Sequence, residues 1–309
     1  MRILMKVAIV LLLLVGAGAA LFVVADPEQF DLDAAARVTA PGRFVSLADG
    51  VTHYQIAGPA DGRVVVLAAG ISVPYYIWDP TFAALTEAGF RVLRFDYYGR
   101  GYSDRPDIPY TQEMYVRQLA QLLDALQIAQ PIDLAGLSYG GSVVTSFAAR
   151  FPDRVRSLIY VDPSFWSAYT PSFLQAHPRI WNYMTAVFEE RWWADLQTDD
   201  FVHPERFPDW ADRYRPQVRY RGFRRAQLST AVSNASVDQA PELMRVGSHP
   251  RPVLVFWGAN DRSVPFEFSS SLMQAMPRAR LVAVKDAGHL PHWEQPDVVH
   301  PELLAFLRQ

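Results

Sequence analysis

The chain has 309 residues, of which half are hydrophobic and one fifth charged, and its formal net charge is −3. This is an ordinary globular composition with ample length for a large core, and it lacks the basic surface of a nucleic-acid-binding protein. The absence of cysteine excludes disulfides, thiolate metal sites and cysteine nucleophiles.

The N-terminal segment is apolar. Residues 7–25 contain no charge and follow Arg2 and Lys6. Their length approaches that of a membrane span, and positive residues before a span place the following chain on the exported side. We expect residues 1–25 to be an uncleaved membrane anchor. One alternative is a signal peptide cleaved after Ala25, which would leave a secreted or periplasmic protein, and another is a helix buried in a cytosolic core.

After a linker over residues 26–41, short apolar runs alternate with helical patterns. The runs "RFVSLADG" and "VTHYQIAG" flank Asp49-Gly50 and predict a β-hairpin. Further strands are predicted from continuous apolar runs at 64–70, 91–96, 131–138, 157–162, 252–258 and 279–288. Helical periodicity lies between them, at 76–88, 111–128, 140–151, 265–276 and 297–308. This alternation predicts an α/β fold with a mostly parallel, doubly wound sheet and the hairpin at one edge.

One interval breaks the alternation. Residues 164–250 contain no convincing strand, carry several prolines and hold five of the eight tryptophans, Trp166, Trp181, Trp192, Trp193 and Trp210. We predict a helical cap inserted between two parts of the core, 42–163 and 251–309. Its aromatic side chains are expected partly to form the cap's own core and partly to face an apolar ligand.

A candidate nucleophile lies in "LAGLSYGG". Gly136 and Gly140 each stand two residues from Ser138, directly after a predicted strand. Glycines at these positions permit a tight strand-to-helix bend that presents the serine hydroxyl above the sheet edge. The alternative is an ordinary glycine-rich turn in which Ser138 caps a helix.

A serine hydroxyl needs a base, and the base needs an orienting acid. His289 follows the last predicted strand, at the sheet edge where Ser138 also lies. Asp261 ends another strand 28 residues earlier and is the first choice for the acid, although it could instead cap the helix near Pro265. Asp162, which ends the strand after the nucleophile helix, is the rival acid.

Other polar residues have structural interpretations. Asp96 is expected to fix the glycine turn that follows its strand, His292 to be structural, and His300 to lie on a solvated helix face. The order Ser138, Asp261, His289, with each residue at a strand's carboxyl end, favours nucleophilic catalysis more than any single motif does.

These motifs resemble the α/β-hydrolase fold superfamily, in its capped serine esterase- and lipase-like branch, over about residues 42–308. The resemblance rests on "LAAGISVPYYIWDP", "DYYGRGYSDRP", "LAGLSYGGSV", "WGANDRSVP" and "AGHLPHWEQP". It implies a Ser138 nucleophile, an Asp261 acid, a His289 base and a mobile cap across the cleft.

The loop that would stabilise the reacting oxygen departs from the family pattern. Ala69-Gly70 stands where members usually carry His-Gly. The backbone N–H groups of Ile71 and Tyr139 are the expected donors, and backbone donors do not depend on side-chain identity. Ser72 offers an additional hydroxyl or is simply an exposed loop serine.

The expected reaction is hydrolysis of a carboxylic ester through an acyl-enzyme on Ser138, with neither cofactor nor metal. The aromatic cap favours an apolar acyl group, and an anchored enzyme would meet lipid-like esters such as monoacylglycerols. A carbon–carbon bond hydrolase, a lactonase, an aminopeptidase and a perhydrolase would use the same triad. The intact triad argues against a non-catalytic ligand-binding relative.

Overall fold

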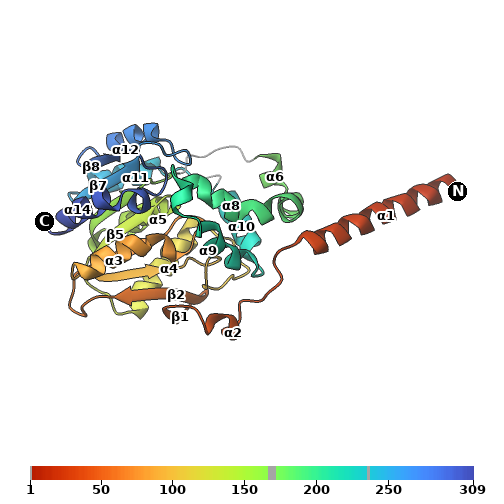
Figure 1. Cartoon of the computed structure of the whole chain (residues 1–309), viewed down its shortest axis with the longest axis horizontal. Helices are drawn as coiled ribbons and strands as arrows, with labels where there is room; N and C mark the ends of the chain where they lie inside the picture. Colours follow the sequence, from red (N-terminus) through yellow and green to blue (C-terminus); the bar gives the residue numbers. More distant parts are fainter. Residues whose placement is uncertain (1, 166–171, 235–236) are drawn as a thin grey trace.

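The computed structural model describes residues 2–165, 172–234 and 237–309 (Figure 1), so Trp166 lies outside the described residues. An eight-stranded sheet with the order β1-β2-β4-β3-β5-β6-β7-β8 forms its centre. The strands are β1 (Arg43–Leu47), β2 (Gly50–Ala57), β3 (Val64–Ala68), β4 (Arg91–Phe95), β5 (Ile132–Leu137), β6 (Val155–Val161), β7 (Val253–Gly258) and β8 (Arg280–Val284).

The pairing confirms the predicted topology. β1 and β2 form an antiparallel hairpin at one edge, β2 is antiparallel to β4, and every later pair is parallel. All residues of β3, β5 and β7 are buried, as expected of strands covered on both faces. The last strand is shorter than predicted, because β8 ends at Val284 and a loop continues to His289.

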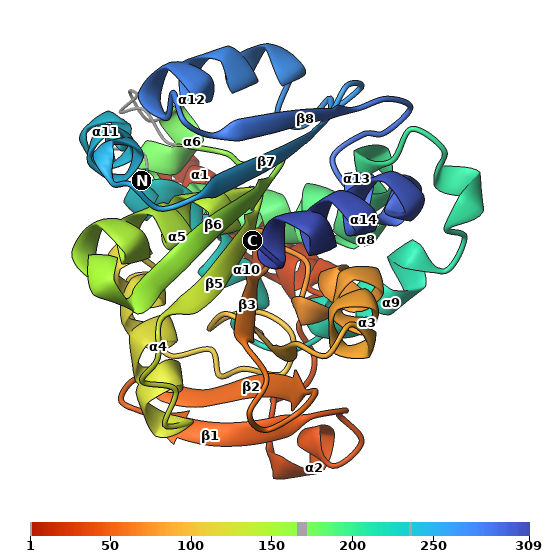
Figure 2. The same cartoon turned by 90° about the vertical axis from the view of Figure 1, so that its left-hand side faces the viewer.

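Two helical layers cover the sheet (Figure 2). One face packs against α4 (Gln112–Ala125), α5 (Tyr139–Arg150), α11 (Ala240–Ser248) and α12 (Ser269–Ala275). The other face packs against α3 (Asp79–Glu87), α13 (Pro291–Glu294) and α14 (Pro296–Leu307). Short 3₁₀ turns add η1 (Tyr75–Trp78), η2 (Pro152–Arg154) and η7 (Phe266–Phe268).

The chain between β6 and β7 is helical in its described parts, and we call its helices up to α10 the cap. They are α6 (Phe173–Ala176), α7 (Pro178–Met184), the π turn η3 (Thr185–Glu189), η4 (Glu190–Trp192), α8 (Trp193–Leu196), η5 (Gln197–Asp200), η6 (Pro204–Arg206), α9 (Trp210–Val218) and α10 (Phe223–Asn234). The prolines of this interval leave mostly short helices, although Pro216 lies inside α9. Pro216 lies in the last turn of α9, where its missing N–H removes little of the helix's bonding.

The N-terminal helix α1 (Arg2–Ala25) projects from the cap side of the molecule (Figure 1). Its stretch Met5–Ala25 is long and apolar enough to cross a membrane, and the described side chains of this stretch are exposed or half-buried. The described part of α1 is therefore not a helix buried in a core, so that interpretation of the N-terminal segment is wrong. The following chain forms α2 (Ala34–Arg37), and Arg37 pairs with Asp104 of the core.

Candidate active site

Ser138 stands on a strained bend between β5 and α5. Its backbone has φ 52° and ψ −124°, a conformation that non-glycine residues rarely adopt and that often marks a functional site. The Ser138 amide donates to the Val161 carbonyl (3.0 Å), which ties the bend to β6. A Cβ on Gly140 would lie 2.4 Å from the Ala69 carbonyl oxygen, so only glycine permits this approach. The bend therefore has the geometry that the glycine spacing predicted.

The side chains of His289 and Asp261 form a direct hydrogen bond. Nδ1 of His289 lies 2.7 Å from Oδ2 of Asp261, and both side chains are buried. The other carboxylate oxygen of Asp261 accepts the amides of Ser263 and Val264 at 2.8 and 2.9 Å. Asp261 thus shapes its own loop rather than capping α12. With Oδ2 as the acceptor, Nδ1 carries the proton and Nε2 is left as the basic atom.

The charge environment of His289 favours its protonated form. Burial opposes this form, but the hydrogen bond and charge of Asp261, joined by the charge of Asp200, outweigh burial and raise the pKa of His289. Burial in turn raises the pKa of Asp200. Asp200 comes from the cap and was not a candidate in the sequence, because nothing local marks it.

A buried carboxylate ties the His289 loop to the cap. Glu294 is 1% exposed and accepts the amides of Gly288 (2.6 Å), Val202 (2.7 Å) and His203 (3.2 Å). Nearby, the His289 amide donates to the Asp200 carbonyl (2.8 Å). Glu294 has no signal in the sequence, since a glutamate in a short helical turn resembles any surface residue.

The rival acid is close to the chosen one. One carboxylate oxygen each of Asp162 and Asp261 and one ring nitrogen of His289 all lie within 4.8 Å of one another. Asp162 accepts the Gly258 amide (2.7 Å), while the His289 ring bonds Asp261. Burial, and then the neighbouring Asp261 charge, raise the pKa of Asp162 well above its ordinary value. Burial thus favours the uncharged form of Asp162, next to the carboxyl group that bonds the His289 ring.

Ser138 and His289 open onto one cavity of about 210 Å³. Ile71 is in its wall, and Tyr139 is the first residue of α5, directly after Ser138. The Ser72 hydroxyl is not a free exposed group, because it donates to Oε1 of Gln197 from the cap (2.9 Å). The wall is formed by Gly70, Ile71, Ser72, Val73, Ile77, Leu137, Ser138, Leu196, Gln197, Asp200, Ser263 and His289.

No described tryptophan of the cap lines this cavity, contrary to the expectation that some would face a ligand. Trp210 is buried and packs edge-on against Phe201 and Trp293. Rings at this junction instead fill the space between the cap and the sheet, because large aromatic surfaces supply the core that short helices need.

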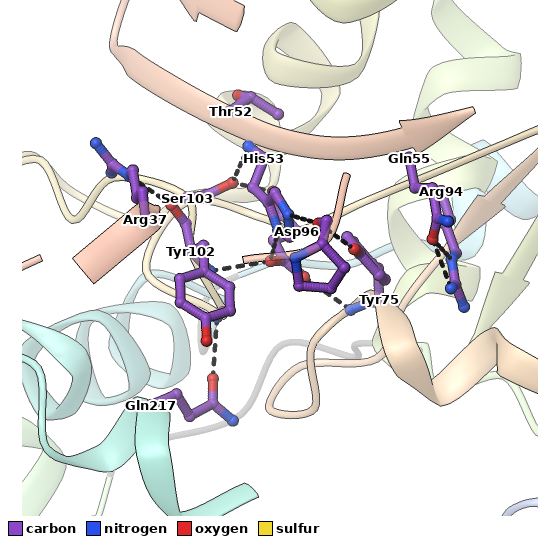
Figure 3. Close-up of polar contacts among 12 residues, drawn as sticks. Arg37, Thr52, His53, Gln55, Tyr75, Arg94, Asp96, Tyr102, Ser103 and Gln217 are labelled. Carbon is purple, nitrogen blue, oxygen red and sulfur yellow. Dashed lines mark hydrogen bonds and ion pairs between the residues drawn. The ribbon is translucent and has the colours of Figure 1, made fainter. Parts of the chain in front are cut away.

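His53 and Asp96 form a second buried pair at the edge hairpin (Figure 3). Nδ1 of His53 lies 2.7 Å from Oδ2 of Asp96, which also accepts the Tyr102 amide (3.0 Å). The other oxygen of Asp96 accepts the Tyr75 amide (2.8 Å). Asp96 thus fixes the loop after β4 as predicted. Nε2 of His53 faces the Pro41 carbonyl, so both ring nitrogens of His53 have a hydrogen-bond partner.

The remaining histidines near the site are structural. Nε2 of His292 bonds the Ile77 carbonyl (2.8 Å), and burial lowers the pKa of His292 to about 3. His300 is half-buried and lies 3.2 Å from the Thr81 hydroxyl, so its expected solvated position is wrong.

Comparison with known proteins identifies the fold family. The family model described as "alpha/beta hydrolase fold" matches residues 63–296. The carboxylesterase YbfK of Bacillus subtilis is 27% identical over 85% of this chain and 86% of its own length. A 2-hydroxymuconate semialdehyde hydrolase of Pseudomonas putida is 32% identical over 70% of this chain and 75% of its own.

A solved structure agrees with this assignment. The enol-lactonase from Burkholderia xenovorans LB400 superposes with a TM-score of 0.73 at 26% identity, covering 86% of this chain and all of that one. The family model spans most of the chain and matches the observed sheet, and these relatives are hydrolases. The chain is therefore a hydrolase of the α/β-hydrolase fold family.

Proposed function

We propose that the protein is a serine hydrolase that cleaves uncharged carboxylic esters. One observation carries the proposal: the strained Ser138 shares a cavity with His289, whose Nδ1 lies 2.7 Å from Asp261. The carboxylesterase and lactonase among the compared proteins support ester chemistry.

In the first step Nε2 of His289 accepts the Ser138 proton as Oγ attacks the ester carbonyl carbon. The C=O bond becomes a single bond to an oxyanion, which the backbone N–H groups of Ile71 and Tyr139 stabilise. The intermediate collapses, the C–O bond to the alcohol breaks, and imidazolium returns the proton to the leaving oxygen. Asp261 stabilises the imidazolium throughout.

In the second step the acyl group on Ser138 is hydrolysed. Water gives a proton to His289 as its oxygen attacks the acyl carbon, and the second intermediate releases the carboxylic acid and regenerates the serine. These two steps need no oxidant, reductant or cofactor.

The cavity wall favours a neutral substrate. Asp200 contributes a carboxylate, and no lysine or arginine is among the described residues that line the cavity. A substrate bearing a carboxylate would meet repulsion without a compensating cation, which favours an ester over an anionic carbon–carbon hydrolase substrate. A volume of about 210 Å³ accommodates the ester group and a short acyl chain.

We further propose that residues 42–163 and 251–309 form the catalytic core and residues 164–250 the insertion, whose helices up to α10 form a mobile cap. The apolar stretch Met5–Ala25, whose length suits a bilayer, supports an uncleaved anchor with the catalytic part on the exported side. Cleavage after Ala25 would instead give a secreted or periplasmic enzyme.

The test is a series of p-nitrophenyl esters of increasing chain length, assayed with the wild type and Ser138→Ala. We expect hydrolysis by the wild type and a loss of about 10⁴–10⁶-fold in kcat for the variant. Circular dichroism provides the control that the variant is folded. If Ser138→Ala keeps more than about a tenth of the wild-type rate, the nucleophile is a different group.

A further inference from the structure

An exposed apolar row follows the cap helices from α7 to α8. Five side chains at a constant spacing of four residues are between 36% and 53% exposed, and we call them the apolar stripe: Ile180, Met184, Phe188, Trp192 and Leu196. The row spans residues 180–196, through α7, η3, η4 and α8. Single exposed apolar side chains are normal, but five of them on one segment of the cap are typical of a contact surface.

The cap does not need these side chains for its own core. The same helical turns bury Thr185, Ala186, Val187 and Ala194 on their other side. Glu190, between two members of the stripe, is fully buried against Arg224. The turns thus have one inward face that is packed, and the apolar stripe lies on their outward side, beside the exposed Glu189 and Asp195.

The part of the stripe up to η3 lies next to the N-terminal helix. Helix α1 packs against η3, and the Tyr183 hydroxyl donates to the Gly18 carbonyl (3.1 Å). The rings of Phe22 and Tyr183 stack with centroids 5.8 Å apart. Arg224 holds the chain directly after α1 through an ion pair to Asp26 (2.9 Å). The helix therefore leaves the cap at a fixed place.

The other end of the stripe reaches the candidate active site. Leu196 is 53% exposed and also lines the cavity that holds Ser138 and His289. The stripe consequently connects the base of α1 with the mouth of the cavity along a single run of helical turns.

The length of α1 determines how deep this surface would lie. Met5–Ala25 has 21 residues, about 31 Å of helix, which matches a hydrocarbon core of about 30 Å. Gly18 is seven residues before Ala25, so its contact with Tyr183 lies about 10 Å along the helix from that end. If α1 fills the hydrocarbon core, the cap beside Tyr183 must enter the bilayer surface by about this depth, which is the depth typical of interfacial helices.

We propose that the apolar stripe is a membrane-contact surface, on which the acyl chain of a neutral lipid ester reaches the Ser138 cavity from the adjacent leaflet. The cavity takes the ester group and the first carbons, and the remaining chain lies along the stripe, covered by lipid. This inference rests on the proposed ester hydrolase and on α1 as its anchor. Trp192 and Phe188 are side chains of the kind that membrane interfaces favour.

The test uses the full-length protein in phosphatidylcholine vesicles that contain doxyl-labelled lipid. The chain has no cysteine, so single variants Phe188→Cys, Leu13→Cys and Val298→Cys each carry one fluorophore. Val298, on α14 at the far side from α1 (Figure 1), is exposed to a similar extent as Phe188 and serves as the control. We expect doxyl lipid to quench the probes at 188 and 13 by about half or more, and the probe at 298 by less than about a tenth.

Each other outcome overturns the inference. Quenching at 13 without quenching at 188 would place the cap clear of the membrane. Protection at 188 that depends on protein concentration and not on lipid would assign the stripe to a second copy of the chain. No quenching at 13 would remove the anchor, whereas hydrolysis of a soluble ester in the same samples reports separately on the proposed hydrolase.

A second experiment measures ester hydrolysis by the double variant Phe188→Ser/Trp192→Ser. The double variant Met244→Ser/Val298→Ser, whose residues are similarly exposed but lie outside the stripe, is the control. For a monoacylglycerol in vesicles, we expect the first pair to lower the rate about tenfold or more and the control pair to leave it within about twofold. Both pairs should hydrolyse a short soluble ester at the wild-type rate. An equal loss on soluble and vesicle esters would mean damage to the fold and would contradict a membrane role.

Discussion

Asp162 and Asp261 lie side by side after β6 and β7, with one carboxylate oxygen of each and one ring nitrogen of His289 all within 4.8 Å of one another. Only Asp261 bonds the His289 ring, at 2.7 Å, whereas Asp162 accepts the Gly258 amide. The two acids that the sequence offers therefore lie together, and they differ in their hydrogen-bond partners. Asp261 is placed to orient an imidazole, whereas burial raises the pKa of Asp162.

This arrangement predicts unequal effects of two matched substitutions. Asp261→Asn should lower kcat by about 10⁴-fold, because an amide favours the wrong imidazole tautomer. Asp162→Asn keeps an acceptor for the Gly258 amide in a side chain of the same shape and should cost less than about tenfold. Steady-state kinetics on a short ester, with circular dichroism of both variants, measures the difference. Should Asp162→Asn be the inactive protein, the acid belongs to β6.

The activity should depend on pH through His289 and respond to Asp200. The base acts only when neutral, so kcat/KM should rise with pH through the raised pKa of His289. Asp200→Asn removes a negative charge that favours imidazolium and should therefore lower the pKa of His289. The rise of kcat/KM on the acidic side of the pH profile, which we call the acidic limb, should then move to lower pH. The measurement is the pH profile of kcat/KM, with Asp286→Asn on the exposed His203 pair as the control. A limb that stays in place or moves upward would refute the electrostatic role of Asp200.

Glu294 should stabilise the junction between the cap and the His289 loop. Glu294→Gln puts an amide nitrogen opposite backbone N–H donors at a buried site, which should lower the free energy of unfolding by about 1–3 kcal/mol. We also expect a lower kcat, because the Gly288–His289 backbone loses its anchor. Glu302→Gln is the control, since its exposed pair with Arg280 contributes about 0–1 kcal/mol. Equal midpoints of denaturant unfolding for the two variants would show that Glu294 has no special role.

The N-terminal helix should retain the protein in membranes. Met5–Ala25 carries one charge, Lys6, at its start and is uncharged from residue 7 onward, so full-length protein should sediment with membranes and resist extraction by carbonate or high salt. Removing residues 1–25 should release an enzyme with unchanged activity on short soluble esters. Edman sequencing of the native protein provides the decisive check, because a start at Asp26 would demonstrate a cleaved signal peptide.

Local patterns were sufficient for much of the fold and the candidate site. Continuous apolar runs predicted β3 and β5 because strands buried on both faces need such runs, and the glycines around Ser138 predicted the bend because no side chain fits there. Contacts across the cap were not predictable. Asp200 and Glu294 acquire their environments only when the cap meets the His289 loop, and this meeting has no local signal.

The apolar stripe could not be predicted from the sequence, for a different reason. Its members are all exposed although the helical turns change from α to π to 3₁₀ between Met184 and Trp192. A regular helical period does not describe such a segment, so sequence periodicity could not separate its outward face from its buried one.

The most direct test of the proposed chemistry is covalent labelling of Ser138. A fluorophosphonate reacts with a serine activated by a base, so the native protein should gain one adduct by intact mass, located on the Ser138 peptide, as ester hydrolysis falls in parallel. Ser138→Ala should gain no adduct, and His289→Gln should label far more slowly. An enzyme that loses ester hydrolysis while Ser138 stays unmodified, or that hydrolyses esters undiminished with Ser138 labelled, would contradict the account.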